Sequence, residues 1–245
     1  MSKPRILILD IETSPHKGYF WGLFDQNIGL SQLEEPGRTI VVGYQWFGER
    51  KVHVLDERDG ARAMFAKAHA VLVEADAVVT YNGDSFDLPR LAGAFVEHRL
   101  PPMPPVTSID LIKTARKLGG ASNKLEYIAR RFGIGEKIKA GGMQLWLDCL
   151  AGLASAWARM RRYNAQDVRL TGRLYRLFRP YIVNHPYLGS SVRLLVGSKV
   201  VGTCPRCRST RIQSRGTRRT RAMVIQRLQC LGCGGWHDGR KEKAK

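Results

Sequence analysis

The first part of the chain carries short runs of apolar residues that end in charged positions. Residues 5–12 (RILILDIE) are mostly apolar until two carboxylates close the run, which is typical of a buried strand that presents side chains at its end. Two further runs, at 39–47 and 51–57, are separated only by Gly48-Glu49-Arg50. This spacing predicts an antiparallel hairpin with a short turn.

From residue 60 onward the pattern alternates between helical and strand-like periods. Apolar residues recur at helical spacing over 60–75, and the run AVVTYN follows at 77–82. The segment PPMPP must then interrupt regular structure. The remaining elements expected are a helix at 88–100, a strand near 106–111 and a helix near 112–118. Antiparallel pairing followed by crossovers implies an α/β fold, with a mixed five-stranded sheet and helices on both faces.

The second half of the chain indicates helices, then a connector and a separate tail. Apolar residues of 125–132 recur at i, i+3, i+4 and i+7, which predicts a helix facing the core. A basic, glycine-containing loop follows at 133–142, and helices resume to about Phe178. We therefore expect a main domain over 1–180, a connector over 181–198 and a small unit over 199–245.

Composition adds a strong positive charge. The 245 residues include 40 Lys and Arg against 21 Asp and Glu, which gives a formal net charge of +19 and a pI near 10.2. Such a surface attracts polyanions, and nucleic acid is the commonest of them. A basic protein that is merely soluble is the alternative.

Targeting signals and membrane spans are not expected. No segment reaches the roughly 18 apolar residues that a spanning helix requires. Acidic residues interrupt the apolar N-terminal run, and no small-residue cleavage site follows it. The 5 cysteines, without a secretory signal, indicate a reducing compartment. We therefore predict a cytoplasmic location and no membrane partner.

Acidic residues stand in three separated motifs. Asp10 and Glu12 are two apart on a strand and would project to the same side of the sheet. Asp87 follows another expected strand, and Asp167 lies four residues after Tyr163 on one face of a helix. Hard oxygen ligands of this kind suit Mg²⁺ or Mn²⁺, and a two-metal nuclease needs about four of them around two cations.

Each motif alone also has a plain structural interpretation. The acids at the strand end could simply be solvated. Asp84 or Asp87 could cap the helix that follows. Tyr163 could pack in the core beside an exposed Asp167. Only the three motifs together favour a metal site.

The segments LDIET, NGDSFDLP and YNAQD, in this order, resemble the three exonuclease motifs of the DEDD superfamily of 3′→5′ exonucleases, which have a ribonuclease H-like fold. The most similar branch is the exonuclease domain of family B DNA polymerases, and the resemblance spans about residues 5–178. It implies that Tyr163 orients the attacking water, because Arg162 stands where the histidine subclass has its histidine. It implies four ligands for two Mg²⁺ or Mn²⁺ ions: Asp10, Glu12, Asp87 and Asp167.

The resemblance also implies an activity. Phosphodiester bonds would be hydrolysed from 3′ ends, with DNA favoured over RNA, single strands preferred and nucleoside 5′-monophosphates released. Asn82 matches an asparagine of the second motif and is expected at the terminal nucleotide. The exonuclease unit is expected to be free-standing, similar to arrangements in bacteriophage genomes, so a bacterial or phage-infected cell and a replication or repair protein partner are the corresponding expectations.

The tail contains two CxxC pairs separated by 22 residues. Four thiolates at this spacing can form a closed tetrahedral site for one structural Zn²⁺. The residues between the pairs, including 223–229, suggest strands, so the unit resembles a zinc ribbon. Disulfides or free thiols are the alternative. The expected zinc ligands are Cys204, Cys207, Cys230 and Cys233.

Further residues are candidates for nucleic-acid binding. Lys137 and Lys139 lie in the loop at 133–142 and could meet phosphates or remain solvated. Phe86 could contact the substrate, although packing in the core is favoured. Arginines between the cysteine pairs could bind phosphates or form a solvated loop. These arginines are Arg215, Arg218, Arg219 and Arg221.

Two other functions compete with a DNA exonuclease. A catalytically inactive nucleic-acid-binding adaptor could keep the fold, but the complete set of catalytic residues argues against it. An RNA-directed exonuclease could use the same acids, because four carboxylates do not by themselves distinguish DNA from RNA.

Overall fold

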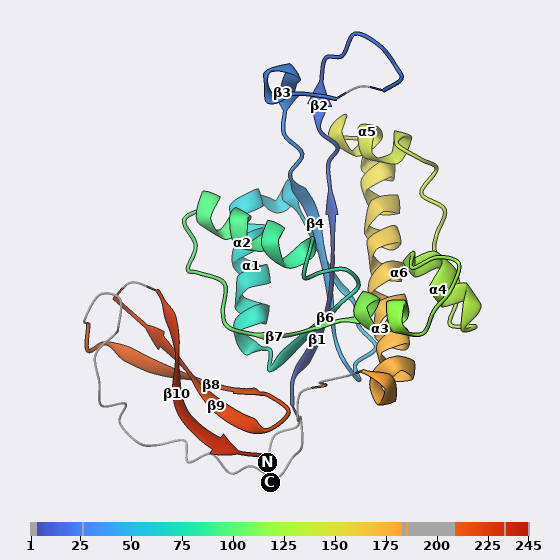
Figure 1. Cartoon of the computed structure of the whole chain (residues 1–245). Coiled ribbons are helices and arrows are strands. Elements are labelled where there is room, and N and C mark those ends of the chain that lie inside the picture. The colour runs from blue at the N-terminus through green and yellow to red at the C-terminus, as the bar shows by residue number, and fades with distance from the viewer. Residues whose placement is uncertain (1–3, 26, 183–184, 186–208, 233, 245) are drawn as a thin grey trace.

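The central sheet has five strands in the order β5-β4-β1-β6-β7 (Figure 1). This computed structural model describes residues 4–25, 27–182, 185, 209–232 and 234–244. Strand β1 pairs antiparallel with β4 and parallel with β6. The expected mixed five-stranded sheet is confirmed. Its strands are β1 (Ile6–Thr13), β4 (Thr39–Trp46), β5 (His53–Asp56), β6 (Ala77–Thr80) and β7 (Thr107–Asp110).

Helices cover both faces of this sheet, as expected. α1 (Ala61–Glu74) and α2 (Asp87–Glu97) pack on one face. α3 (Leu111–Lys117), α4 (Leu125–Arg131) and α6 (Ala154–Phe178) pack on the other, while α5 (Gln144–Leu150) packs beside α6. The described part of the chain also contains three short 3₁₀ helices: η1 (Leu30–Gln32), η2 (Glu57–Asp59) and η3 (Arg179–Tyr181). Within the described ranges, no helix is long and apolar enough to cross a membrane.

The apolar run of β1 is buried on both sides, which explains why it does not alternate with polar residues. Ile6 and Ile8 contact the layer of α3, α4 and α6. Leu7 and Leu9 contact the layer of α1 and α2. Because successive side chains point to opposite faces, a strand buried on both faces must be apolar at every position. Polar residues occur only where this strand nears its end, at Asp10, Glu12 and Thr13.

A second, small hairpin projects beyond the carboxyl end of β1 (Figure 1). It consists of β2 (Lys17–Gly18) and β3 (Leu33–Glu35), which pair antiparallel. Its base is held by an ion pair of 2.9 Å between Lys17 Nζ and Glu34 Oε1. The sequence pattern did not predict this hairpin.

The C-terminal region forms a separate antiparallel sheet in the order β10-β9-β8. Its strands are β8 (Ile212–Arg219), β9 (Met223–Cys230) and β10 (Trp236–Lys243). The strands expected between the cysteine pairs are therefore present. The connector expected over 181–198 falls largely outside the described residues.

One buried arginine joins this sheet to the main body. Arg227 on β9 is 2% exposed and donates hydrogen bonds to the carbonyl oxygens of Ala75 at 2.8 Å and Val73 at 3.0 Å. These carbonyls lie at the carboxyl end of α1, where a cation is favoured by the helix dipole. On the neighbouring strand, the carbonyl of Arg219 accepts a hydrogen bond from Thr107 Oγ1 at 3.2 Å. The small sheet is thus docked in a defined orientation.

Replacing Arg227 with alanine is expected to loosen this docking. The change leaves two buried carbonyls without their donor, at a cost of about 2–5 kcal/mol. Thermal unfolding should begin at a lower temperature, and limited proteolysis should release the C-terminal region earlier. Arg221→Ala removes an exposed arginine of the turn between β8 and β9 and serves as the control. Equal melting and proteolysis of the two variants would contradict the docking role.

Candidate active site

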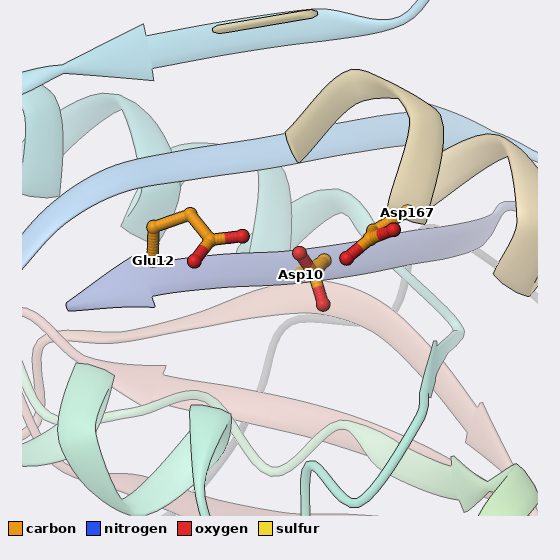
Figure 2. Close-up of side chains that lie close together, drawn as sticks. All are labelled: Asp10, Glu12 and Asp167. Atoms are coloured by element: carbon orange, nitrogen blue, oxygen red, sulfur yellow. The ribbon is translucent and has the colours of Figure 1, made fainter. Parts of the chain in front are cut away.

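Three carboxylates from two elements converge at the carboxyl half of β1. Figure 2 shows Asp10 and Glu12 on β1, with Asp167 approaching them from α6. One carboxylate oxygen from each residue lies within 4.8 Å of the others. The two-residue spacing on the strand and the packing of α6 across it produce this arrangement. A cluster of this size is compatible with shared coordination of a divalent cation.

Asp87 lies close to this cluster. It is the first residue of α2 and is 4% exposed. Its Oδ1 accepts a hydrogen bond from the backbone N–H of Ile11 at 3.1 Å, which ties the start of α2 to the strand between the other two acids. The alternative of helix capping is not supported, because the N-cap is Phe86 and no side-chain cap hydrogen bond forms there. Asp84 instead pairs with Lys113.

Burial and mutual repulsion make the carboxyl groups weak acids. Desolvation, followed by the charges of Glu12, Asp87 and Asp167, raises the pKa of Asp10 well above its ordinary value. Desolvation and the charge of Asp167 raise the pKa of Glu12 to about 8. Desolvation raises the pKa of Asp87 to about 7. Because their charged forms are unfavourable, these carboxyl groups tend to bind either protons or cations.

Lys137 supplies a positive charge to the cluster. Its Nζ lies 2.6 Å from Asp167 Oδ2 and donates a hydrogen bond of 3.3 Å to Tyr163 Oη. Burial alone would lower the pKa of Lys137, but the charge of Asp167 raises it above its ordinary value. Desolvation and the charge of Asp167 raise the pKa of Tyr163 to about 12, so its phenol keeps its proton at neutral pH.

Asn164 belongs to the site, although sequence reasoning assigned it no role. Its Nδ2 donates a hydrogen bond of 2.8 Å to Asp10 Oδ2. The side chain occupies the space above Gly43, which pairs with Asp10 across β1 and β4. A Cβ on Gly43 would overlap Asn164 Oδ1. The available signal was the position of Asn164 inside the YNAQD motif, next to Tyr163.

A buried carboxylate shapes the loop that leads to Asp87. Asp110 accepts hydrogen bonds from the backbone N–H groups of Asn82 at 2.7 Å and Asp84 at 3.2 Å. Asn82 adopts a φ of 70°, a left-handed conformation that asparagine tolerates better than most residues. Asp110 was also missed by sequence reasoning, because its partners lie 26 and 28 positions away.

A cavity of about 510 Å³ lies next to the acids, with Lys137 bordering both. Its volume is within the usual range for small-molecule sites. Asn82, expected at the terminal nucleotide, is one of the residues that line it. The lining residues are Tyr81, Asn82, Ile112, Asn123, Lys124, Leu125, Glu126 and Lys137.

Other candidate residues lie in different settings. Phe86 packs against the core beside α1 and α2, as favoured. Lys139 is exposed, and its carbonyl accepts a hydrogen bond from Arg159 Nη2 at 2.9 Å. Among the interactions of the described residues, neither Phe86 nor Lys139 contacts the carboxylate cluster.

The four arginines of the C-terminal sheet divide into two groups. Arg215 and Arg221 are exposed. Arg218 forms a bidentate pair with Asp238 at 3.1 and 2.7 Å, and Arg219 is only 9% exposed at the junction with the main body. Arg215 Nε also donates a hydrogen bond of 3.1 Å to Gln229 Oε1. Phosphate binding by the four arginines stays a prediction.

Of the expected zinc ligands, only Cys230 lies within the described residues. It is fully buried, and its Sγ accepts a hydrogen bond from the backbone N–H of Gly232 at 3.3 Å. Cys204, Cys207 and Cys233 fall outside the described residues. Cys149, which is not one of the expected zinc ligands, is 2% exposed and packs with Trp157 and Met160.

The donor set fits a divalent cation. Asp10, Glu12 and Asp167 offer only oxygen ligands, which Mg²⁺ and Mn²⁺ prefer. Among the described residues, none donates a hydrogen bond to the buried Oδ1 of Asp167. A buried carboxylate oxygen without a donor is costly unless a cation meets it.

Comparison with known proteins places the fold. Residues 7–179 match the RNase_H_2 family, described as RNase_H superfamily, so the chain belongs to the RNase H superfamily. No match was found among curated proteins. The structure is similar to RNase D of Trypanosoma brucei, with a TM-score of 0.46, 16% identity, and coverage of 76% of this chain and 59% of that one. The structure is also similar to the GMP complex of this RNase D, with a TM-score of 0.44, 17% identity, and coverage of 76% of this chain and 52% of that one. The chain thus spans little more than half the length of these structures.

Proposed function

We propose that the protein is a metal-dependent exonuclease that hydrolyses phosphodiester bonds from the 3′ end of single-stranded DNA. One observation carries the proposal, namely the convergence of Asp10, Glu12 and Asp167 within 4.8 Å on a fold of the RNase H superfamily. Asp87, which is itself buried, adds a fourth carboxylate beside them. The net charge of +19 supports a polyanionic substrate.

The four acids would hold two Mg²⁺ or Mn²⁺ ions. When bound, such ions supply Lewis-acid activation of water and stabilise the leaving oxygen of an in-line displacement. The protein's own contribution is to keep the carboxylates in place. Asn164 fixes the carboxylate of Asp10, and the backbone of Ile11 fixes that of Asp87. Both acids are thereby oriented before substrate arrives.

Tyr163 and Lys137 would orient the reacting groups. The phenol of Tyr163 remains protonated at neutral pH and can donate to a water or a phosphate oxygen, which favours positioning over proton removal. Lys137 already lies against Asp167 and can neutralise a phosphate oxygen brought to the cluster. The cavity lined by Asn82 would take the terminal nucleotide.

The C-terminal sheet would bind one structural Zn²⁺ through Cys204, Cys207, Cys230 and Cys233. The hydrogen bond from Gly232 to Cys230 Sγ supports this role, because backbone donors stabilise a thiolate. The exposed Arg215 and Arg221 would then contact the phosphate backbone away from the cleavage site.

The test is the degradation of a 5′-labelled single-stranded DNA with Mg²⁺ or Mn²⁺. We expect a ladder that shortens from the 3′ end and disappears with EDTA and in the Asp10→Ala variant. Asp59→Ala, which makes the same chemical change at an exposed residue of η2, serves as the control. A labelled RNA is assayed in parallel. Preferential cleavage of the RNA would identify RNA, and not DNA, as the substrate. Binding of both strands without cleavage would favour the inactive adaptor.

A further inference from the structure

The hairpin beyond β1 exposes an unusual number of large apolar side chains. Within residues 19–30 these side chains are aromatic at four positions and aliphatic at three. Their exposed fractions are Tyr19 70%, Phe20 52%, Trp21 99%, Leu23 81%, Phe24 83%, Ile28 52% and Leu30 89%. Contiguous exposure on this scale in a protein marks an interaction surface.

The base of the hairpin is well held, which distinguishes the exposed tip from a frayed segment. Tyr19 N donates to the carbonyl of Gln32 at 2.9 Å, and Gln32 Nε2 donates to the carbonyl of Tyr19 at 3.0 Å. Gln32 Oε1 also accepts from Gly29 N at 2.9 Å. The rings are therefore presented on a fixed support, which lowers the entropy cost of binding.

The hairpin is continuous with the strand that carries the catalytic acids. Only residues 13–16 separate Glu12 from the start of β2. Trp21 lies nine positions after Glu12, a contour of at most about 32 Å. At 3.4 Å per stacked nucleotide this corresponds to roughly nine nucleotides or fewer. A strand with its 3′ end at the carboxylates can therefore reach the hairpin.

We propose that this hairpin is a stacking platform for unpaired bases of the single strand whose 3′ end occupies the carboxylate cluster. The inference rests on the proposed function. Aromatic rings stack on any base, which suits a sequence-tolerant nuclease. Residues 19–30 contain no Lys or Arg, so the tip offers its rings to bases and leaves phosphates to the basic parts of the chain. Its direct continuity with the strand carrying Asp10 and Glu12 favours substrate over a protein partner.

The test measures binding of a twelve-nucleotide oligothymidylate to the full-length protein in EDTA, where the strand remains intact. We expect tryptophan fluorescence to be quenched on binding and this quenching to be lost in Trp21→Phe, which keeps a ring. Trp21→Leu, which keeps apolarity but loses the ring, should bind about five- to a hundred-fold more weakly. Val96→Ala changes a residue that is 77% exposed on α2 and should bind as wild type does.

Several results would overturn the stacking role. Quenching that persists in Trp21→Phe would show that another tryptophan is quenched. An unchanged DNA affinity of Trp21→Leu would show that the ring of Trp21 does not contribute to binding. A wild type that sediments as a dimer, with a monomeric Trp21→Leu of equal DNA affinity, would make the hairpin an interface between copies. If wild type degrades labelled DNA but shows neither hairpin effect, only this inference fails. If it neither binds nor degrades DNA, the proposed function fails as well.

Discussion

Replacing Asp167 with asparagine is expected to lower kcat for hydrolysis of a 5′-labelled DNA strand by about a thousand-fold or more. The substitution keeps the shape of the side chain but removes the charge that would hold a cation between α6 and β1. Charge stabilisation of this kind contributes several kcal/mol to the transition state, and each 1.36 kcal/mol is a factor of ten. Initial rates at saturating substrate with Mg²⁺ or Mn²⁺ measure the loss.

Two further variants define what this loss means. Asp59→Asn makes the same chemical change at an exposed residue and should leave kcat unchanged. Tyr163→Phe keeps all four carboxylates but removes the phenol, so a smaller loss of about ten- to a hundred-fold in kcat is expected. An Asp167→Asn protein that retains most of its activity would contradict the assignment of Asp167 as a ligand.

Divalent cations are expected to stabilise the protein far more at about pH 8.5 than at about pH 6. Burial raises the pKa of Glu12 from 4.5 to about 8 and that of Asp87 from 3.8 to about 7. A group whose folded pKa is raised contributes stability that is present below its unfolded pKa and is lost as pH rises through the folded pKa. The metal-free protein therefore loses stability between about pH 4 and pH 8, and a bound cation should restore it. Thermal melting with EDTA or Mn²⁺ across this range tests the effect.

The Asp10→Asn variant supplies the matched comparison for this pH dependence. It removes one charge from the cluster, and its amide oxygen can still accept the hydrogen bond from Asn164. In EDTA at about pH 8.5 it should melt above wild type, by about 2–4 °C for each kcal/mol of repulsion relieved. It should also lose most of the gain from Mn²⁺. A metal effect that is equal at both pH values would contradict the buried acidic cluster.

The order of strands and helices in the main body was predictable because its burial pattern is simple. β1 is apolar at successive positions because both of its faces are covered, and α4 has its apolar residues on one face. The proline segment at 101–105 separated α2 from β7 as expected. The hairpin of β2 and β3 was missed for the opposite reason. Its strands have two and three residues, and its apolar side chains face solvent, so no period was available to detect it.

The acids of the candidate site were predictable because they stand in short motifs, and the structure gathers three of them. The residues that orient them were not. Asn164 and Asp110 act through hydrogen bonds to residues far away in the sequence. The contact of Lys137 with Asp167 depends on how the loop at 133–142 folds back onto α6, which no local pattern determines. For the same reason, the burial of Arg219 against the main body was invisible in a segment that looked uniformly basic.

The close approach of Asn164 to Gly43 restricts which sequences can keep this site. Any side chain at position 43 would displace Asn164, and a smaller residue at position 164 would release Asp10 from its hydrogen bond. The two positions therefore cannot vary independently, although they lie 121 positions apart in the sequence. In a library that randomises both positions and selects for nuclease activity, glycine at 43 and asparagine at 164 would be recovered together, and intermediates that change only one would be lost.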